Sequence, residues 1–336
     1  MNKHLEYLDH PQGCFVDRLK EKADTEPVDV IMATLDAESF LEKCLYTVYR
    51  EIPVRKLVVC DGGSKDDTLQ ILKNYPRVEL FVKPEIRTTG RVLEFLISMV
   101  ETSWFVMIDS DIELTKGWYD EMKKHVNEYD ALESGKRINA FHFYREEKSK
   151  LESDTRSLDI CHLVKKSAVQ NFHCDDDYMW RYTDIFLRQV IEESGFTYGK
   201  VNAITHVHNQ TEKTLYKSDT EKNYQEIRFI EPQSVITDQK KYDAFLTKHA
   251  KAVVKYLDPD YFMVKNVIWF DPLIALLDRD WIEQNGPKWL KRYDAAISGI
   301  STFKRFILRI LVRSKLLRRF KYYYQHKKSP TRVKSD

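Results

Sequence analysis

Residues 104–111 read Trp-Phe-Val-Met-Ile-Asp-Ser-Asp, an apolar run that leads directly into two acidic residues. A short apolar run of this kind is typical of a buried strand, so Asp109 and Asp111 should lie at its carboxyl end. Residues two apart on a strand point to the same face, and carboxylate oxygens are ligands that Mg²⁺ and Mn²⁺ prefer. The spacing therefore predicts a divalent cation at Asp109 and Asp111, and through it a bound diphosphate. The alternative is a solvated turn after the strand.

The rest of the first half alternates apolar runs with amphipathic segments. We expect strands over 28–33, 56–60, 78–82 and 104–108, helices over 38–49 and 91–101, and a helix that follows the turn 61–68 and runs to about residue 74. Strands that alternate with helices indicate an α/β fold with a mostly parallel sheet. Ligands of such sheets bind at the carboxyl ends of the strands, where the acidic pair is expected.

The second half has a less regular pattern. We expect further strands over 140–143, 160–164 and 203–208, and a helix over 184–194. The organisation predicted for the whole chain is a polar, irregular N-terminal arm over 1–26, an α/β domain over 27–215, a helical C-terminal extension over 216–299 and a basic amphipathic tail over 300–336.

Composition places the chain among ordinary folded proteins. Of its 336 residues, 43% are hydrophobic and 32% are charged, which is not the balance of a disordered chain. No apolar stretch approaches the roughly 20 residues that span a bilayer. The first residues contain no apolar signal-peptide core, and the five cysteines form no Cys-x-x-Cys pair. We therefore expect a cytoplasmic protein with reduced thiols.

The C-terminal tail carries most of the basic charge. Residues 300–336 contain twelve Lys and Arg residues against Asp336 alone, whereas the whole chain has a net charge of only +2, so the body is acidic. The apolar residues follow helical spacing, with Arg305 and Arg309 on the other face. A basic amphipathic helix of this kind predicts binding of an anionic membrane surface through residues 300–328, on the cytoplasmic face of the membrane. The alternative is a helix that packs on its own domain. Because the body is acidic, no nucleic-acid partner is expected.

Several motifs occur in an order that resembles a known family. They are the strand and loop Val30–Glu38, the loop Asp61–Thr68, the Asp109-Ser110-Asp111 motif, and Asp184–Arg188 followed by Thr205–His208. Together they resemble the family 2-like glycosyltransferases of the GT-A fold. The resemblance implies that a sugar is transferred from a nucleoside-diphosphate sugar to a glycan or lipid-linked acceptor, with Mn²⁺ or Mg²⁺ as cofactor.

The same resemblance implies where the donor binds. Thr34 and Asp36, just after the first strand, are expected to contact the nucleotide, and Asp61 is expected to accept a hydrogen bond from its base. A plain turn cap is the alternative for Asp61. Gly90 and Arg91 open a helix whose N-terminus and guanidinium could meet the diphosphate, although Arg91 could equally be a surface residue.

Metal ligands are expected at the end of two strands. Asp111 is predicted to contact the metal directly, and Asp109 to contact a metal-bound water or the sugar-ribose side. Related enzymes place a metal-binding histidine where His206 and His208 stand. Because residues alternate along a strand, one of the two should face the site, and we favour His208; a buried structural histidine is the alternative.

The catalytic base is predicted among acidic residues before or at the start of the 184–194 helix. Family members usually carry an acidic pair just before this point, but Arg181 and Tyr182 stand there. Asp184, or one of Asp175 to Asp177 with Asp176 as our choice, is the candidate general base. Inversion and retention of the anomeric configuration both stay open.

Two other classes of function share features of this chain. A sugar-phosphate nucleotidyltransferase usually needs a Gly-rich, basic loop after the first strand, and Ala33-Thr34-Leu35-Asp36 is not one. A non-catalytic, basic-tailed binding protein is disfavoured by the acidity of the body. The sequence thus favours a glycosyltransferase over both.

Overall fold

The computed structural model describes residues 16–21, 26–86, 88–142, 149–154, 160–174, 183–211, 263–264, 267–268 and 283–284. Contacts divide the chain into two units, Met1–Phe245 and Leu246–Asp336. In the second unit, the described strands β10 (Met263–Val264) and β11 (Val267–Ile268) form an antiparallel pair. This pair lies within 216–299, for which the sequence predicted mostly helix. The basic tail lies outside the described residues, and the predicted domain boundaries stay predictions.

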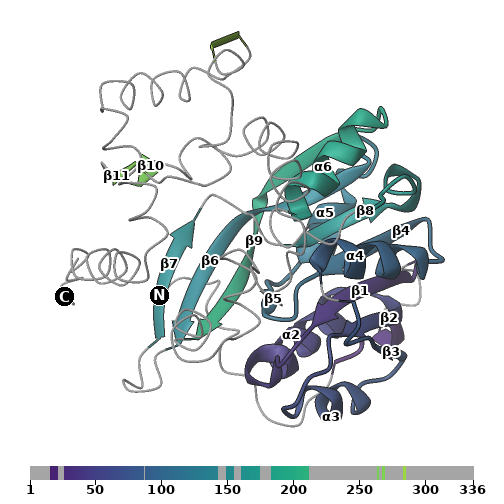
Figure 1. The fold of residues 1–336 in the computed structure, drawn as a ribbon, viewed down its shortest axis with the longest axis vertical. Helices are drawn as coiled ribbons and strands as arrows, with labels where there is room; N and C mark the ends of the chain where they lie inside the picture. The colour runs from purple at the N-terminus through teal and green to yellow at the C-terminus, as the bar shows by residue number, and fades with distance from the viewer. Residues whose placement is uncertain are drawn as a thin grey trace. The chain divides into compact units, whose positions relative to one another are not determined.

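The first unit is built on one nine-stranded sheet (Figure 1). Its path runs β3-β2-β1-β4-β8-β6-β9-β5, and β7 pairs with β6. The strands are β1 Val28–Thr34, β2 Val54–Asp61, β3 Val78–Val82, β4 Trp104–Ile108, β5 Ile112–Leu114, β6 Ala131–His142, β7 Ser149–Asp154, β8 Cys161–Lys165 and β9 Tyr198–Thr211. All strands predicted from apolar runs are present, with longer bounds in several cases.

The sheet has a parallel half and a mixed half. Strands β3, β2, β1 and β4 pair with one another in parallel, as the alternation of strands and helices predicted. Beyond them, β8 is antiparallel to both β4 and β6, β6 is parallel to β9, and β5 is antiparallel to β9. The α/β fold class is confirmed, and the parallel half brings the carboxyl ends of β1, β2 and β4 to one edge.

Helices pack against both the parallel and the mixed half of the sheet. The longer ones are α2 Glu38–Glu51, α4 Thr89–Ser98 and α6 Thr183–Glu193; the shorter are α3 Thr68–Lys73 and α5 Trp118–Lys123. Helix α2 buries Leu41, Leu45 and Val48, spaced by three and four residues as an amphipathic helix requires. They share a core cluster with Val30 of β1. Ile31, which points to the other face of the strand, is also buried, and α4 packs against β1.

The N-terminal arm is not wholly irregular, contrary to expectation. Within it lies the short helix α1 (Arg18–Glu21). The buried carboxylate of Asp17 accepts two hydrogen bonds of 2.9 Å from Arg77, and Arg18 donates to the carbonyl of Glu51 at 2.7 Å. The sequence pattern missed this because the anchoring partners lie far along the chain.

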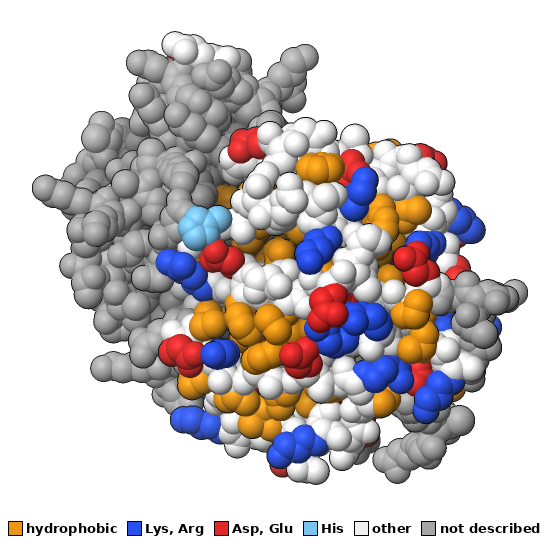
Figure 2. Space-filling view, turned by 90° about the vertical axis from the view of Figure 1, so that its right-hand side faces the viewer, with side chains coloured by type: hydrophobic (Ala, Val, Ile, Leu, Met, Phe, Trp, Pro, Cys, Tyr) orange, Lys and Arg blue, Asp and Glu red, His pale blue; other side chains and the backbone are white. Residues whose placement is uncertain are grey.

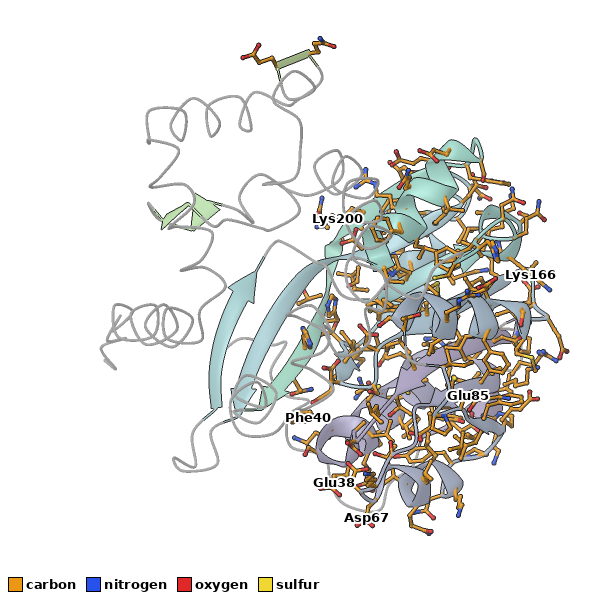
Figure 3. The ribbon with its side chains drawn as sticks, in the orientation of Figure 1. Glu38, Phe40, Asp67, Glu85, Lys166 and Lys200 are labelled. Carbon is orange, nitrogen blue, oxygen red and sulfur yellow. The ribbon has the colours of Figure 1, made fainter. Side chains whose placement is uncertain are left out.

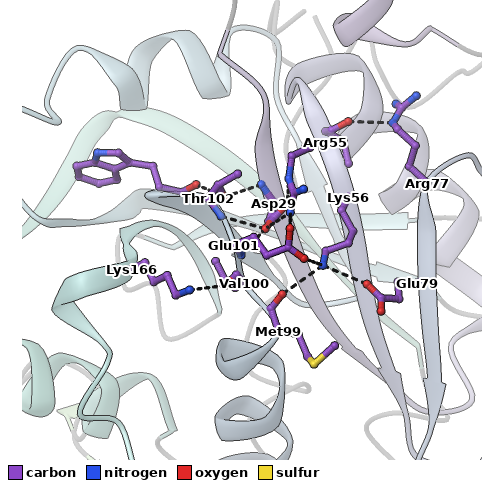
Figure 4. A network of polar contacts seen from close by, with 12 residues as sticks. Asp29, Arg55, Lys56, Arg77, Glu79, Met99, Val100, Glu101, Thr102 and Lys166 are labelled. Atoms are coloured by element: carbon purple, nitrogen blue, oxygen red, sulfur yellow. Dashed lines mark hydrogen bonds and ion pairs between the residues drawn. The ribbon is translucent and has the colours of Figure 1, made fainter.

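At the amino ends of the parallel strands, charged side chains form a network (Figure 4). Asp29 of β1 is fully buried and accepts from Arg55 Nε at 2.7 Å and Nη2 at 2.9 Å. Arg55 also pairs with Glu101, as does Lys56. The main-chain N–H groups of Glu101 and Thr102 donate to Asp29 as well. The buried negative charge is therefore matched by neighbouring cations and donors.

Acidic and basic side chains lie intermingled on the described part of the face shown in Figure 2. Ion pairs that are at least partly accessible to solvent include Lys124 with Glu121 and Arg188 with Glu192, three and four positions apart. Such pairs contribute at most about 1 kcal/mol each, so the core holds the fold. Among the residues that the structure describes, no helix has the length and apolar character needed to cross a bilayer.

Candidate active site

The carboxyl ends of the parallel strands bring together the residues that the sequence singled out. Thr34 ends β1 and lies opposite Asp61, which ends β2. On the other side of β1, Ile31 lies opposite Met107, so β4 ends at the same edge and Asp109 follows it directly. The predicted convergence of these loops is therefore present in the fold.

Two loops at this edge are tied to each other. The main-chain N–H of Asp36 donates to Ser64 Oγ at 2.8 Å, and Asp36 Oδ1 accepts from the N–H of Lys65 at 2.9 Å. Asp36 has φ +48, a left-handed conformation that Asp tolerates better than most residues. At the starts of α2 and α3, Glu38 Oε2 accepts from the N–H of Asp67, and Figure 3 shows the two residues side by side. Asp36 thus joins the loop after β1 to the loop after β2, and both loops contain residues that we predicted would contact the nucleotide.

Thr34 and Asp61 have contrasting surroundings. Asp61 Oδ1 accepts from the N–H groups of Gly63 and Ser64, each at 2.8 Å, and Oδ2 accepts from Ser64 Oγ. Asp61 therefore caps the turn, which was the alternative role, and its contact with a base stays a prediction. Thr34 is only 6% exposed, and its Oγ1 has no hydrogen-bond partner within the described part of the chain.

Gly90 and Arg91 lie in the first turn of α4, as predicted. Thr88 caps this helix, accepting from the N–H of Arg91 at 3.4 Å. The guanidinium of Arg91 lies 3.9 Å from Glu94 Oε2, and Glu94 Oε1 also pairs with His173. The start of α4 is thereby linked to the segment that precedes residues 175–182.

Asp109 is fixed against the start of β8. Its N–H donates to the carbonyl of Ile160 at 2.9 Å, and its Oδ2 accepts from the N–H of Ile160 at 3.1 Å. Cys44 Sγ donates to the carbonyl of Asp109 at 3.5 Å. One carboxylate oxygen of Asp109 is thus directed to the main chain.

Asp111 and His208 come together although 97 positions separate them. His208 Nε2 lies 3.2 Å from Asp111 Oδ2, and both side chains are partly accessible, at 17% and 32% exposure. His206 is buried instead, with Nδ1 2.9 Å from Ser134 Oγ. Alternation along β9 therefore separates the two histidines, and His208 is the one at the acidic pair.

The site concentrates negative charge. Burial raises the pKa of the Cys44 thiol well above its ordinary value, and the charges of Asp111, Glu113 and Asp109 raise it further. In the part of the chain that is described, the carboxylate of Asp111 has one ion-pair partner, His208. This donor set of carboxylate and imidazole suits Mn²⁺ or Mg²⁺. Within the described residues, however, no three such groups are gathered closely enough to hold a metal, so Asp109 does not join the other two as a third ligand here.

The predicted bases are placed less completely. Asp176 lies outside the described residues, and of Asp184 the structure describes only the backbone, as the second residue of α6. Sequence analysis missed Glu113 and Asn209, which flank Asp111 and His208. The one signal was position, since Glu113 continues the alternation from Asp111 and Asn209 follows His208 directly.

Comparison with known proteins agrees with this geometry. Residues 29–190 match the model of glycosyl transferase family 2. No curated protein matches the chain. The matched range contains β1 to β4, with Asp61, Asp109 and Asp111, and extends into α6.

Solved structures similar to the chain include three of low identity. TarS of S. aureus in complex with UDP-GlcNAc is 13% identical over 79% of this chain and 83% of that chain, with a TM-score of 0.43. GalNAc-T7 with UDP, GalNAc and Mn²⁺ is 11% identical over 66% and 55%, with a TM-score of 0.43. Glucosyl-3-phosphoglycerate synthase of Mycobacterium tuberculosis, with Mn²⁺, UDP and phosphoglyceric acid, is 16% identical over 60% and 77%, with a TM-score of 0.40.

The family match and the strand order thus lead to the conclusion that the motifs predicted. Residues 29–190 form a glycosyltransferase family 2 domain with a GT-A fold, and the protein is a glycosyltransferase.

Proposed function

We propose that the protein transfers a sugar from a nucleoside-diphosphate sugar to a hydroxyl of a glycan or lipid-linked acceptor, and that a divalent cation at Asp111 is required. The observation that carries this proposal is the 3.2 Å contact between Asp111, inside the range that matches family 2, and His208, which follows that range on β9. The partly accessible carboxylate lies where open α/β sheets bind their ligands.

Asp111 and His208 are the residues that would hold Mn²⁺ or Mg²⁺, with Asp109 contacting a metal-bound water. When bound, the cation offsets the negative charge that builds on the departing nucleoside diphosphate. To bind a cation, His208 Nε2 must present its lone pair rather than a hydrogen to the site. The surplus of carboxylates around Cys44 supports a cation at this position.

The nucleotide is proposed to bind over the ends of β1 and β2. Thr34 Oγ1, buried and with no partner in the described residues, is a hydroxyl that a bound nucleotide would satisfy. Gly63 has φ +91, and a Cβ there would lie 3.1 Å from Pro84, so this turn depends on glycine. Asp36 supports the turn from the neighbouring loop. Arg91, half-exposed in the first turn of α4, is proposed to contact the diphosphate.

The base is proposed to be Asp184 or Asp176. A carboxylate at the start of α6, or in the segment before it, would take the proton from the attacking acceptor hydroxyl. The donor side of the site is formed by β1, β2 and β4, so an acceptor would be bound from the side of α6. The resemblance to the family motif at Asp184–Arg188 supports this assignment.

The test of the cation site is Asp111→Ala, assayed for sugar transfer with and without EDTA. A lost cation site removes several kcal/mol of transition-state stabilisation, so transfer should fall by about 10³-fold, and EDTA should abolish wild-type activity. Because Asp111 is partly exposed, the melting temperature should change little. Glu128→Ala, at an exposed position after α5, is the control and should retain activity. Wild-type activity that survives EDTA, together with an active Asp111→Ala, would falsify the metal role.

We further propose that residues 300–328 bind an anionic membrane surface on its cytoplasmic face. The support is the charge of the tail, twelve basic residues against one carboxylate over 300–336. Each basic group near such a surface contributes about 1 kcal/mol, weakened by salt. Full-length protein should sediment with phosphatidylserine vesicles at low salt, and protein lacking 300–336 should remain in solution while still folded. A full-length chain that ignores the vesicles, or a truncation that unfolds, would contradict the membrane role.

A further inference from the structure

Strand β9 contacts Asp111 through two consecutive residues that point to opposite faces. His208 meets the carboxylate of Asp111, as described above. Asn209 meets its carbonyl oxygen twice, from the main-chain N–H at 2.9 Å and from Nδ2 at 3.3 Å. Asp111 lies in the turn between β4 and β5 rather than in a strand, so these bonds are what fixes its backbone against β9.

Glu113 determines how the amide of Asn209 is oriented. The two side chains are buried, at 3% and 1% exposure, and Asn209 Nδ2 donates to Glu113 Oε1 at 2.8 Å. The Glu113 carboxylate and the Asp111 carbonyl are both acceptors, so the side of the amide that faces them must carry the nitrogen and not the oxygen. The two N–H bonds of the amide are therefore directed to Glu113 and to Asp111.

This chain of contacts bears on the proposed cation site. A metal ligand works only if its carboxylate is held in place before the cation arrives, and groups behind the ligands commonly supply that restraint. Here the restraint acts on the backbone of Asp111, while His208 acts on its side chain. Loss of the side-chain amide would leave the main-chain bond of Asn209 intact and so keep β5 paired with β9.

We infer that Asn209 and Glu113 are positioning residues for the cation site: Glu113 orients the amide of Asn209, and Asn209 holds the Asp111 carbonyl so that its carboxylate stays beside His208. This inference rests on the proposed function of Asp111 as a cation ligand. Neither residue touches the cation in this assignment.

The experiment is a titration with Mn²⁺ in which electron paramagnetic resonance measures the free ion, with UDP and GDP tested as added nucleotides. Asn209→Leu, similar in size but unable to donate, should weaken Mn²⁺ binding by about 10- to 100-fold, the range seen when groups behind metal ligands are removed. Glu113→Leu should weaken it to a similar extent. Glu113→Gln keeps an acceptor for Asn209 and should bind Mn²⁺ nearly as the wild type does.

Ser134→Ala is the matched control. It removes the buried hydrogen bond to His206 on the same strand β9, without touching Asp111. Its Mn²⁺ affinity should equal that of the wild type, and thermal denaturation without metal should show that all variants are folded. Weakening by Ser134→Ala equal to that of Asn209→Leu would overturn the inference, since general loosening of β9 would then suffice. Glu113→Gln as weak as Glu113→Leu would overturn the orienting role.

Loss of the cation site and loss of the positioning role give different results in this titration. A wild type that binds no Mn²⁺ overturns the proposed cation site itself. A wild type that binds Mn²⁺, with Asp111→Ala defective and Asn209→Leu normal, overturns only the positioning role of Asn209.

Discussion

The two ends of the parallel strands hold carboxylates in contrasting electrical surroundings. At the amino end, Asp29 is fully buried and accepts hydrogen bonds from Nε and Nη2 of Arg55 (Figure 4). At the carboxyl end, Asp111 is partly exposed and faces the imidazole of His208, with Asp109 and Glu113 near enough to raise the pKa of one shared neighbour, Cys44. The charge of Asp29 is neutralised by an arginine of the protein, so this carboxylate stabilises the fold. Asp111 is accessible and lies among other carboxylates, so it is suited to bind a cation from solution.

The largest expected effect at the amino end comes from Asp29→Asn. The change removes a bidentate ion pair with Arg55. It also replaces one of two acceptor oxygens with an NH₂ group, although donors from Arg55, Glu101 and Thr102 surround both positions. The free energy of unfolding should fall by about 3 kcal/mol, measured by urea denaturation. Transfer activity per folded molecule should stay near that of the wild type.

Glu101→Gln serves as the matched control for this prediction. It removes an exposed partner from the same network, and its effect on stability should be far smaller than that of Asp29→Asn. A stable but inactive Asp29→Asn would break the comparison, because it would give the amino end a role in the chemistry.

A smaller effect of Asp29 on the free energy of unfolding is expected as the pH falls. Burial alone would raise the pKa of Asp29, but hydrogen bonds from Arg55 and from the N–H groups of Glu101 and Thr102 outweigh it and hold the pKa below its ordinary value of 3.8. The unfolded chain therefore takes up this proton first, and the stabilisation is present above pH 4 and is lost as the pH falls through the folded pKa. Urea denaturation between pH 5 and pH 2 should show a steeper loss for the wild type than for Asp29→Asn. If the free energy of unfolding falls equally with pH in both proteins, Asp29 does not contribute to the loss of stability in acid.

The parallel half of the fold could be predicted because each strand is a local apolar run, and the runs alternate with helical spacing. The sequence pattern missed β5 and α5, which are three and six residues long and too short to show a period. It also missed the anchoring of α1. That anchoring depends on Asp17 and Arg77, 60 positions apart, and no local pattern reports such a pair.

The site was predictable to the extent that it depends on strand ends. Asp109 and Asp111 follow an apolar run, and alternation separated His208 from His206. Glu113 and Asn209 were missed because their contact joins positions 96 apart through the pairing of β5 with β9. For Asp61, the sequence could not choose between a base contact and a turn cap, because both place an acceptor at the end of β2. The structure shows the turn cap, and the roles of Asp184 and Asp176 stay predictions.

Anomalous diffraction at the manganese absorption edge, from crystals grown with Mn²⁺ and UDP or GDP, tests the central claim most directly. The account predicts one anomalous peak at the carboxyl edge of the sheet, within about 2.0–2.6 Å of an Asp111 oxygen and close to His208 Nε2, with the diphosphate in contact with the same ion. Crystals of Asp111→Ala should lack the peak. Bound nucleotide with no manganese at Asp111, or a peak at another place on the protein, would contradict the account.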